Sequence, residues 1–177
     1  KYLEWCKIWF HGCFRVLKED GAFYVFQDWR LVSEYVTILK KIFPYYLQNI
    51  TWCRSKGRAS HINWKNSKEE ILYFSKDKQP KFFEQKQLRP VIAPYRNEDG
   101  SPKGWYIDSE TNERVRATGI GNVWHYTPPV WSSKEEKPFH PCQKPIELIK
   151  RIVKSHTEKG DTVLDLFGGS MTTAIVC

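Results

Sequence analysis

The spacing of apolar residues near the start of the chain predicts two helices. Between Leu3 and Leu17, apolar side chains recur every three or four residues, which is the period of one face of an amphipathic helix. We expect Gly21 to end this helix in a left-handed conformation. A second run with the same period covers Val32 to Ile42 and stops before Pro44. The chain therefore begins with two helices that each need an apolar surface to pack against.

Short apolar runs predict the strands that supply this surface. Ala22 to Phe26 is apolar without interruption, as in a strand that helices cover on both faces. Leu47 to Cys53 and Ile71 to Phe74 are predicted as two further strands. Helix and strand thus alternate, which favours an α/β fold.

Between Ser75 and His140 the periodicity is lost and turn residues are frequent, for example at Asn97 to Pro102. About 60 residues without clear elements are unusual inside a compact domain unless they form a functional insertion. We therefore expect an irregular insertion here.

Regular structure is predicted again after Pro141. Pro145 suits the first turn of a helix with an apolar stripe, and Gly160-Asp161 turns the chain into an expected strand, Thr162 to Phe167. Gly168-Gly169-Ser170 then leads to a helix beginning at Met171. A strand, a glycine-rich turn and a helix form half of a nucleotide-binding unit, in which helix amides can hold a carboxylate or phosphate. The pattern G-x-G-x-x-G is absent, which counts against NAD or FAD.

Composition adds a charge signal to this picture. Hydrophobic content of 41% with eight Trp indicates a folded chain, and its net charge is +8. Lys40 to Arg89 holds 12 basic and 4 acidic residues, whereas the rest balances at 16 and 16. Such a segment either binds a polyanion or is only a solvated surface. The aromatic residues interleaved with its charges favour binding of nucleic acid. The candidate DNA contacts are Arg54, Lys56, Arg58 and Lys65.

The cysteines and histidines predict no metal site. The five Cys include no C-x-x-C pair and are odd in number, which is typical of free thiols in a reducing cytosol. His11/Cys13 and His140/Cys142 have two-residue spacings without a matched second pair. No apolar run reaches the length of a membrane span and no signal peptide is evident, so we expect a soluble cytoplasmic protein without membrane contact.

Two joined motifs give the strongest functional signal. His140 to Pro145 reads H-P-C-Q-K-P, and after a helix Gly160 to Thr173 reads G-D-T-V-L-D-L-F-G-G-S-M-T-T. This pair resembles the DNA amino-methyltransferases, adenine-N6 or cytosine-N4 specific, in the permuted subgroup whose S-adenosylmethionine motif is at the C-terminal end. Phe14 to Phe26 and Asn66 to Lys76 resemble further family elements. Met171 departs from the pattern, since the family usually has Gly there, and its side chain is expected to crowd the cofactor.

The resemblance implies a fold and a division of the chain. The fold would be a Rossmann-like methyltransferase sheet, mostly parallel, with helices on both faces and an irregular recognition insertion. Residues 1–75 would form the catalytic side, 76–139 the target-recognition insertion and 140–177 the S-adenosylmethionine-binding part, with the first and last parts incomplete. The residues that would line the cofactor site by this resemblance are Lys144, Pro145, Asp165, Phe167, Gly168, Gly169, Ser170, Thr172 and Thr173.

The resemblance also implies an activity, with alternatives. The complete protein would move a methyl group from S-adenosylmethionine to the exocyclic amino group of a base flipped out of double-stranded DNA, adenine rather than cytosine, in a bacterial or phage-infected cell. A restriction endonuclease or a second copy are possible partners. The alternatives are a non-catalytic DNA-binding remnant and a methyltransferase acting on RNA.

No catalytic residue is assigned, because the family's D-P-P-Y or S-P-P-Y tetrapeptide does not occur in this sequence. Residues 1–177 alone are therefore expected to be inactive. Thr127 to Val130 reads T-P-P-V and lacks the aromatic ring that stacks on a base. Pro141-Cys142 resembles the nucleophilic pair of cytosine-carbon methyltransferases, but it lies inside the H-P-C-Q-K-P motif.

Overall fold

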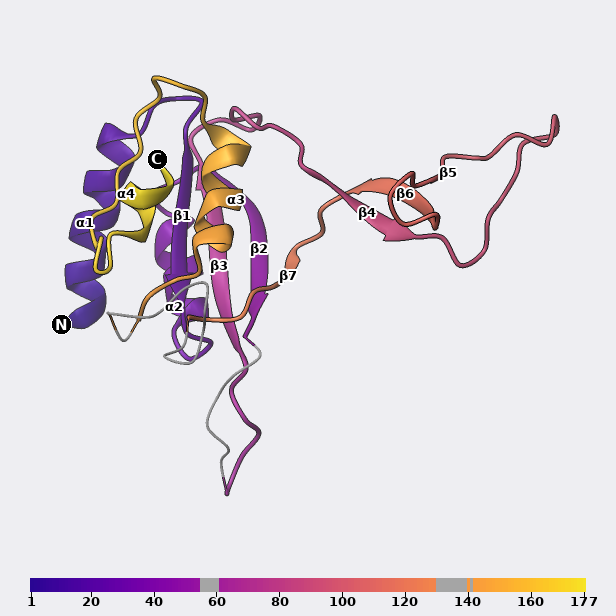
Figure 1. The fold of residues 1–177 in the computed structure, drawn as a ribbon. Coiled ribbons are helices and arrows are strands. Elements are labelled where there is room, and N and C mark those ends of the chain that lie inside the picture. Colours follow the sequence, from indigo (N-terminus) through magenta and orange to yellow (C-terminus); the bar gives the residue numbers. More distant parts are fainter. Residues whose placement is uncertain (55–60, 130–139, 141) are drawn as a thin grey trace. The chain divides into compact units, whose positions relative to one another are not determined.

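The computed structural model describes residues 1–54, 61–129, 140 and 142–177 and divides the chain into two compact units. The core unit comprises Lys1–Phe83 and Asn122–Cys177. The inserted unit comprises Glu84–Gly121, which lies within the range where the sequence predicts an insertion (Figure 1).

The core unit contains four helices and four strands in its described residues. They are α1 (Tyr2–Val16), β1 (Ala22–Gln27), α2 (Val32–Leu39), β2 (Tyr45–Cys53), β3 (Lys68–Ser75), β7 (Val123–His125), α3 (Ile146–His156) and α4 (Thr172–Val176). The helices and strands expected before residue 76 are all present, so apolar periodicity identified them correctly. None of the helices in the described ranges is long and apolar enough to cross a membrane.

The core sheet has the strand order β1-β3-β2-β7. β3 pairs antiparallel with both β1 and β2, and only β2 and β7 pair in parallel. The expectation of a mostly parallel sheet is therefore wrong for the described strands. β1 and β2 run in the same direction because α2 connects them, whereas the described part of the connection from β2 to β3 contains no helix, so β3 returns in the opposite direction.

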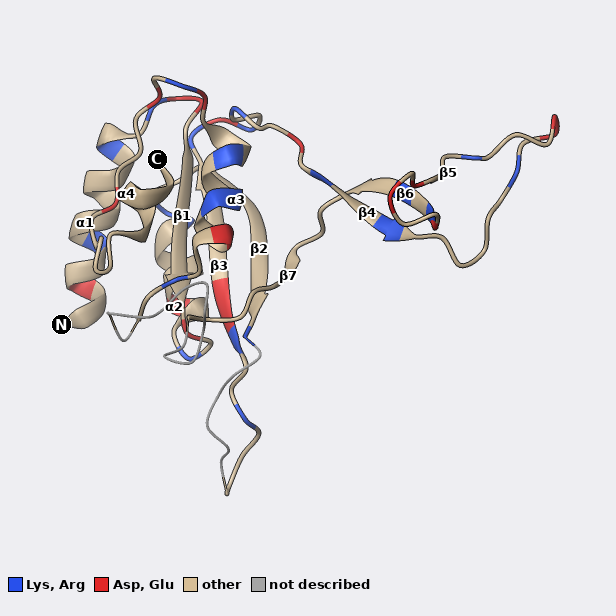
Figure 2. Ribbon diagram, in the orientation of Figure 1, with Lys and Arg blue, Asp and Glu red and all other residues tan. Residues whose placement is uncertain are grey.

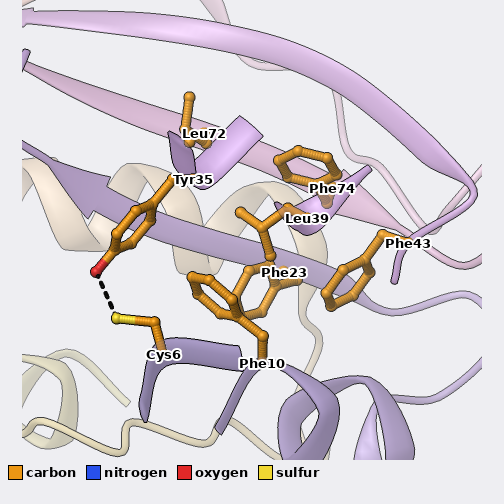
Figure 3. Close-up of a cluster of buried hydrophobic side chains, with 8 residues drawn as sticks. All are labelled: Cys6, Phe10, Phe23, Tyr35, Leu39, Phe43, Leu72 and Phe74. Carbon is orange, nitrogen blue, oxygen red and sulfur yellow. Dashed lines mark hydrogen bonds between the residues drawn. The ribbon is translucent and has the colours of Figure 1, made fainter. Parts of the chain in front are cut away.

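Helices cover both faces of this sheet, as expected for the α/β class. On one face, Phe23 of β1 and Phe74 of β3 pack against Phe10 of α1 and Tyr35 of α2 in a buried cluster (Figure 3). The Tyr35 hydroxyl lies 3.3 Å from Cys6 Sγ inside that cluster. Because successive strand residues point to opposite faces, the neighbouring Tyr24 and Tyr73 face α3 instead. The complete cluster comprises Cys6, Phe10, Phe23, Tyr35, Leu39, Phe43, Leu72 and Phe74.

The end of α1 differs from the expected left-handed stop. Leu17 caps the helix in an extended conformation, with φ −65° and ψ 136°, and Gly21 is not among the residues with positive φ. A Cβ atom on Gly21 would lie 2.7 Å from Leu17 Cδ1. A side chain at this position would therefore require the Leu17 side chain to shift, and periodicity alone carries no information about such a contact.

The run Thr162 to Phe167 is not a strand in the structure, contrary to expectation. No described strand lies beside it to complete a hydrogen-bonded ladder, and a strand is stable only when its backbone groups are paired. Leu164 and Phe167 remain 59% and 57% exposed. The run therefore has the apolar composition of a strand, but no described strand pairs with it.

The inserted unit is more regular than its sequence suggests. It contains a sheet of β4 (Lys86–Pro90), β6 (Arg114–Gly119) and β5 (Tyr106–Ile107), in that order. Val115 of β6 and the neighbouring Trp105 are its buried hydrophobic residues. These strands have polar or exposed residues on both faces, so the alternation that usually reveals a strand is missing.

Hydrogen bonds within the core unit fix the residues that flank the inserted unit on either side. Before it, His156 at the end of α3 bonds through Nδ1 to the Lys81 carbonyl at 2.7 Å and through Nε2 to the Tyr24 hydroxyl at 2.8 Å. The Phe83 amide donates to the Ser155 carbonyl at 2.8 Å. After it, the Thr51 amide donates to the Asn122 carbonyl at 2.8 Å. Since the Lys81 carbonyl only accepts, His156 carries its proton on Nδ1, and Nε2 accepts from Tyr24.

We expect the stability of the core unit to fall as the pH drops below about 6.5, the ordinary histidine value. Burial lowers the pKa of His156, so the unfolded chain binds a proton that the folded chain resists, and stability is lost on acidification. Urea unfolding at pH 7.5 and 5.5 should show this loss for the natural sequence. The loss of unfolding free energy should be smaller for His156→Phe, by at most about 1.4 kcal/mol per pH unit. Exposed His11 gives the control His11→Gln, and an equal pH slope in all three proteins would contradict the expectation.

Candidate cofactor site

Asp165 organises the glycine-rich turn that precedes α4. Its Oδ1 atom accepts a hydrogen bond from the Phe167 amide at 2.9 Å, and its Oδ2 atom accepts one from Thr173 Oγ1 at 2.6 Å. The carboxylate therefore joins the start of the turn to the first turn of the helix. This arrangement explains why an acidic residue stands here even though the run is not a strand.

Left-handed backbone conformations shape the turn itself. Gly169 has φ +50° and Met171 has φ 58°, and the Met171 amide donates to the Gly168 carbonyl at 2.6 Å. A Cβ atom on Gly168 would lie 2.9 Å from Met171 Sδ. A residue other than glycine costs about 1 to 2 kcal/mol in this region, so Met171 holds a strained backbone as well as a bulky side chain.

We expect Met171→Gly to tighten binding of S-adenosylmethionine by up to about fivefold, which corresponds to about 1 kcal/mol, because it removes the side chain that is expected to crowd the cofactor. Calorimetric titration of the complete protein measures the change. Met171→Ala is the matched control, because it removes the bulk and keeps the Cβ atom in the left-handed backbone. Equal affinities for the alanine and glycine variants would assign the effect to bulk, and weaker binding by the glycine variant would reject both explanations.

The turn lies against the H-P-C-Q-K-P segment. A Cβ atom on Gly169 would lie 3.5 Å from His140 Cε1, and Thr172 Oγ1 donates to the Lys144 carbonyl at 3.5 Å. Ser170 and Thr172 are buried, and their hydroxyls are 2.8 Å apart. The structure thus brings together the two motifs that the sequence singles out. His140 is a neighbour of the turn that sequence reasoning did not assign.

Aromatic side chains from α1 form a wall beside the turn. The ring of Phe167 lies 5.8 Å from that of Trp5 and 5.1 Å from that of Trp9, the latter edge to face. Trp5 and Trp9 are one helical turn apart on a different side of α1 from buried Phe10, a spacing that signals a second contact surface. Sequence reasoning missed both tryptophans.

These groups line a cavity of about 1070 Å³ within the core unit. Its lining includes the aromatic wall, Asp165, the glycine turn and His140. Apolar walls with a few convergent polar groups are typical of sites for small organic ligands. The combination fits S-adenosylmethionine, which has an aromatic adenine, hydroxyl groups and a charged amino-acid end. The predicted residues that line the cavity are Lys144, Asp165, Phe167, Gly168, Gly169, Ser170, Thr172 and Thr173.

Lys144 and Pro145 are placed differently from the turn residues. The Lys144 ammonium pairs with Glu69 Oε2 at 2.9 Å and lies over the rings of Phe26 and Trp52, at 5.3 and 5.2 Å. Pro145 is buried immediately before α3 and is not among the cavity-lining residues. Both residues hold the segment in place, and their direct contact with a cofactor stays a prediction.

The candidate DNA contacts also divide into two groups. Arg54 Nη1 pairs with Glu69 Oε1 at 2.9 Å and is only 24% exposed, so its charge is already compensated. Lys65 is exposed. Lys56 and Arg58 lie outside the described residues. Glu69 thus binds Arg54 and Lys144 together, a link between β3 and the H-P-C-Q-K-P segment that the sequence did not reveal.

In the parts of the chain that the structure describes, no three His, Cys, Asp or Glu side chains cluster as a metal site requires. His11, Cys13, His140 and Cys142 are all within those parts. Val130 of the T-P-P-V run and Pro141 of the Pro141-Cys142 pair lie outside the described residues.

Comparisons with known proteins identify the family of the chain. A family model described as DNA methylase, of the N6/N4 type, matches residues 1–177. The Type II methyltransferase M.HpaI of Haemophilus parainfluenzae is 30% identical over 178 residues, which are 100% of this chain and 52% of that protein. M.BglII of Bacillus subtilis is 32% identical over 99% of this chain and 50% of that protein. The chain therefore spans about half the length of these relatives.

Solved structures show the same fold. The complex of M1.HpyAVI with SAM has a TM-score of 0.59 and 20% identity, and covers 97% of this chain and 69% of that one. The cytosine-N4-specific PvuII DNA methyltransferase has a TM-score of 0.67 and 18% identity, and covers 99% and 61%. The Rossmann-like methyltransferase fold expected from the motifs is thereby confirmed.

Proposed function

Because this chain belongs to the N6/N4 DNA methylase family, whose members use S-adenosylmethionine, we propose that the protein carrying it methylates double-stranded DNA at specific sites. The acceptor would be the exocyclic amino group of a base flipped out of the duplex, and we expect this base to be adenine rather than cytosine. The observation that carries the proposal is the turn in which Asp165 joins Phe167 to Thr173 beside the aromatic wall.

Each part of the site has a task in this reaction. When bound, S-adenosylmethionine supplies a methyl group on a positively charged sulfur, which is open to attack by an amino nitrogen. The aromatic wall of Trp5, Trp9 and Phe167 would exclude water and stack on the adenine ring of S-adenosylmethionine. Asp165 would hold the glycine turn in the shape that admits the ligand. Catalysis would then rest chiefly on bringing nitrogen and methyl carbon together in line.

Transfer of labelled methyl groups to duplex DNA by the complete protein tests the proposal. Nucleoside analysis of the product separates N6-methyladenine from N4-methylcytosine. Transfer to RNA in preference to duplex DNA would favour an RNA methyltransferase. Duplex binding without S-adenosylmethionine binding would favour a non-catalytic remnant. We expect residues 1–177 alone to transfer no methyl groups, since the catalytic tetrapeptide does not occur in them.

A restriction endonuclease that cuts the same sequence is a further proposed partner, as is a second copy of the protein. Methylated DNA should then resist cleavage by that nuclease.

A further inference from the structure

One face of the inserted sheet presents a row of arginines. In the antiparallel pair of β4 and β6, Arg89 stands opposite Arg116 and Gln87 stands opposite Thr118. Paired residues share a face, and so do alternate residues of one strand, which places Arg114 on the same side. We call Gln87, Arg89, Arg114, Arg116 and Thr118 the arginine face.

The arginine face carries positive charges that are not paired among the described residues. None of its three arginines forms an ion pair among the described residues, although like charges directly opposite each other destabilise a strand pair. The inserted unit nevertheless contains six basic and six acidic residues. Its aspartates serve the turns: Asp99 accepts hydrogen bonds from Ser101, and Asp108 accepts them from Glu110 and Thr111. Figure 2 shows basic positions on β4, and acidic positions both at the far tip of the inserted unit and in the loop beside β6.

Several groups on the face are held in place or lack a partner. With its amide oxygen turned toward Arg89, Gln87 accepts from Nε at 2.9 Å and from Nη2 at 2.8 Å. The Arg114 guanidinium lies over the ring of Trp105, 5.8 Å from its centroid. Arg116 Nε and Thr118 Oγ1 are shielded from solvent and have no hydrogen-bond partner in the described parts of the chain. The guanidinium groups of Arg89 and Arg114 belong to exposed residues, and a ligand that brings hydrogen-bond acceptors and negative charge would complement them.

We propose that the arginine face enters the major groove of duplex DNA and reads guanine, an inference that rests on the proposed DNA methyltransferase function. A two-stranded β-ribbon fits the major groove, and a guanidinium donates two parallel hydrogen bonds to guanine O6 and N7. The unit has no net charge with which to bind phosphates generally, so its arginines add selectivity more than overall affinity. Lys86 and Leu88 point to the opposite face of β4, away from the bases.

Arg89→Lys and Arg116→Lys test the inference, because lysine keeps the charge and loses the planar fork. In the complete protein, the recognition sequence is first mapped by selecting, from a pool of random duplexes, those that the protein binds, which does not depend on methyl transfer. Binding is then measured to duplexes that carry this sequence, with each base pair changed in turn. We expect discrimination at one guanine position to fall by about 5- to 150-fold in each variant. Affinity for unrelated duplexes and its salt dependence should stay the same.

Lys86→Gln on the opposite face is the matched control and should leave discrimination unchanged. Circular dichroism checks folding, and Gln87→Ala, which frees the Arg89 fork, replaces any variant that fails to fold. Retained discrimination in folded variants would overturn the inference, as would a loss of affinity equal for all duplexes, which indicates phosphate contacts. If the natural protein binds selectively but transfers no methyl group, the proposed function fails while the reading face stands.

Discussion

Asp165→Ala is expected to weaken S-adenosylmethionine binding by about 10- to 100-fold in the complete protein. The substitution removes two hydrogen bonds to a charged acceptor, one from the Phe167 amide and one from Thr173 Oγ1. Such bonds are individually stronger than neutral ones, but Asp165 is exposed, which reduces their contribution. Without them the turn that carries Gly168 and Gly169 loses its anchor, and binding must then order it. Calorimetric titration with S-adenosylmethionine gives the affinity directly.

Two variants separate the role of the turn from general damage. Thr173→Ser keeps the hydroxyl that Asp165 accepts and should bind almost normally, whereas Thr173→Val loses one of the two bonds and should show a smaller defect than Asp165→Ala. Unfolding by urea should show that all three proteins remain folded. A folded Asp165→Ala protein with unchanged affinity would remove this carboxylate from the site.

The second large effect is expected when Lys56, Arg58 and Lys65 are replaced together by glutamine. Removing one phosphate-binding charge should flatten the slope of log K against log salt by about 0.9, hence by at most about 2.7 for the three. Affinity should fall for all duplexes alike, and discrimination between sequences should survive, since phosphate contacts position the protein without reading bases. Arg54 is left in place because its charge is compensated by Glu69.

The control removes three positive charges outside the basic segment, at Arg15, Lys154 and Lys159, which are exposed and form no ion pair among the described residues. It should lower affinity only slightly and leave the slope nearly intact, because screened charges at a distance contribute little. Equal slopes in the natural protein and the first triple variant would show that residues 40–89 are only a solvated surface. Loss of preference for one sequence would show instead that these residues contact bases.

The local structure of the core unit could be predicted because it depends on local patterns. The apolar period of α1 and the unbroken run of β1 are properties of consecutive residues, and helix and strand formation follows them. The glycine turn was recognised by its own sequence and by its distance from H-P-C-Q-K-P. In each case the informative residues lie within about twenty positions of one another.

Features that depend on distant contacts could not be predicted in this way. Trp9 meets Phe167, and Glu69 meets Lys144, through the fold rather than through any spacing in the chain. The antiparallel direction of β3 follows from the path between β2 and β3, which apolar content does not encode. Periodicity also overestimated order at residues 162–167, where the chain has strand-like composition but no described neighbour to pair with.

The two core residues that flank the inserted unit are fixed at points that lie outside the cofactor turn. Phe83 is held by the Ser155 carbonyl before the inserted unit, and Asn122 is held by the Thr51 amide after it, where β7 joins the edge of β2. A foreign segment grafted between these two positions would meet the same anchors and leave Asp165 and its glycines untouched. On the proposed DNA-reading role of the inserted unit, we expect exchange of this single segment, in evolution or in the laboratory, to change DNA specificity without rebuilding the cofactor turn.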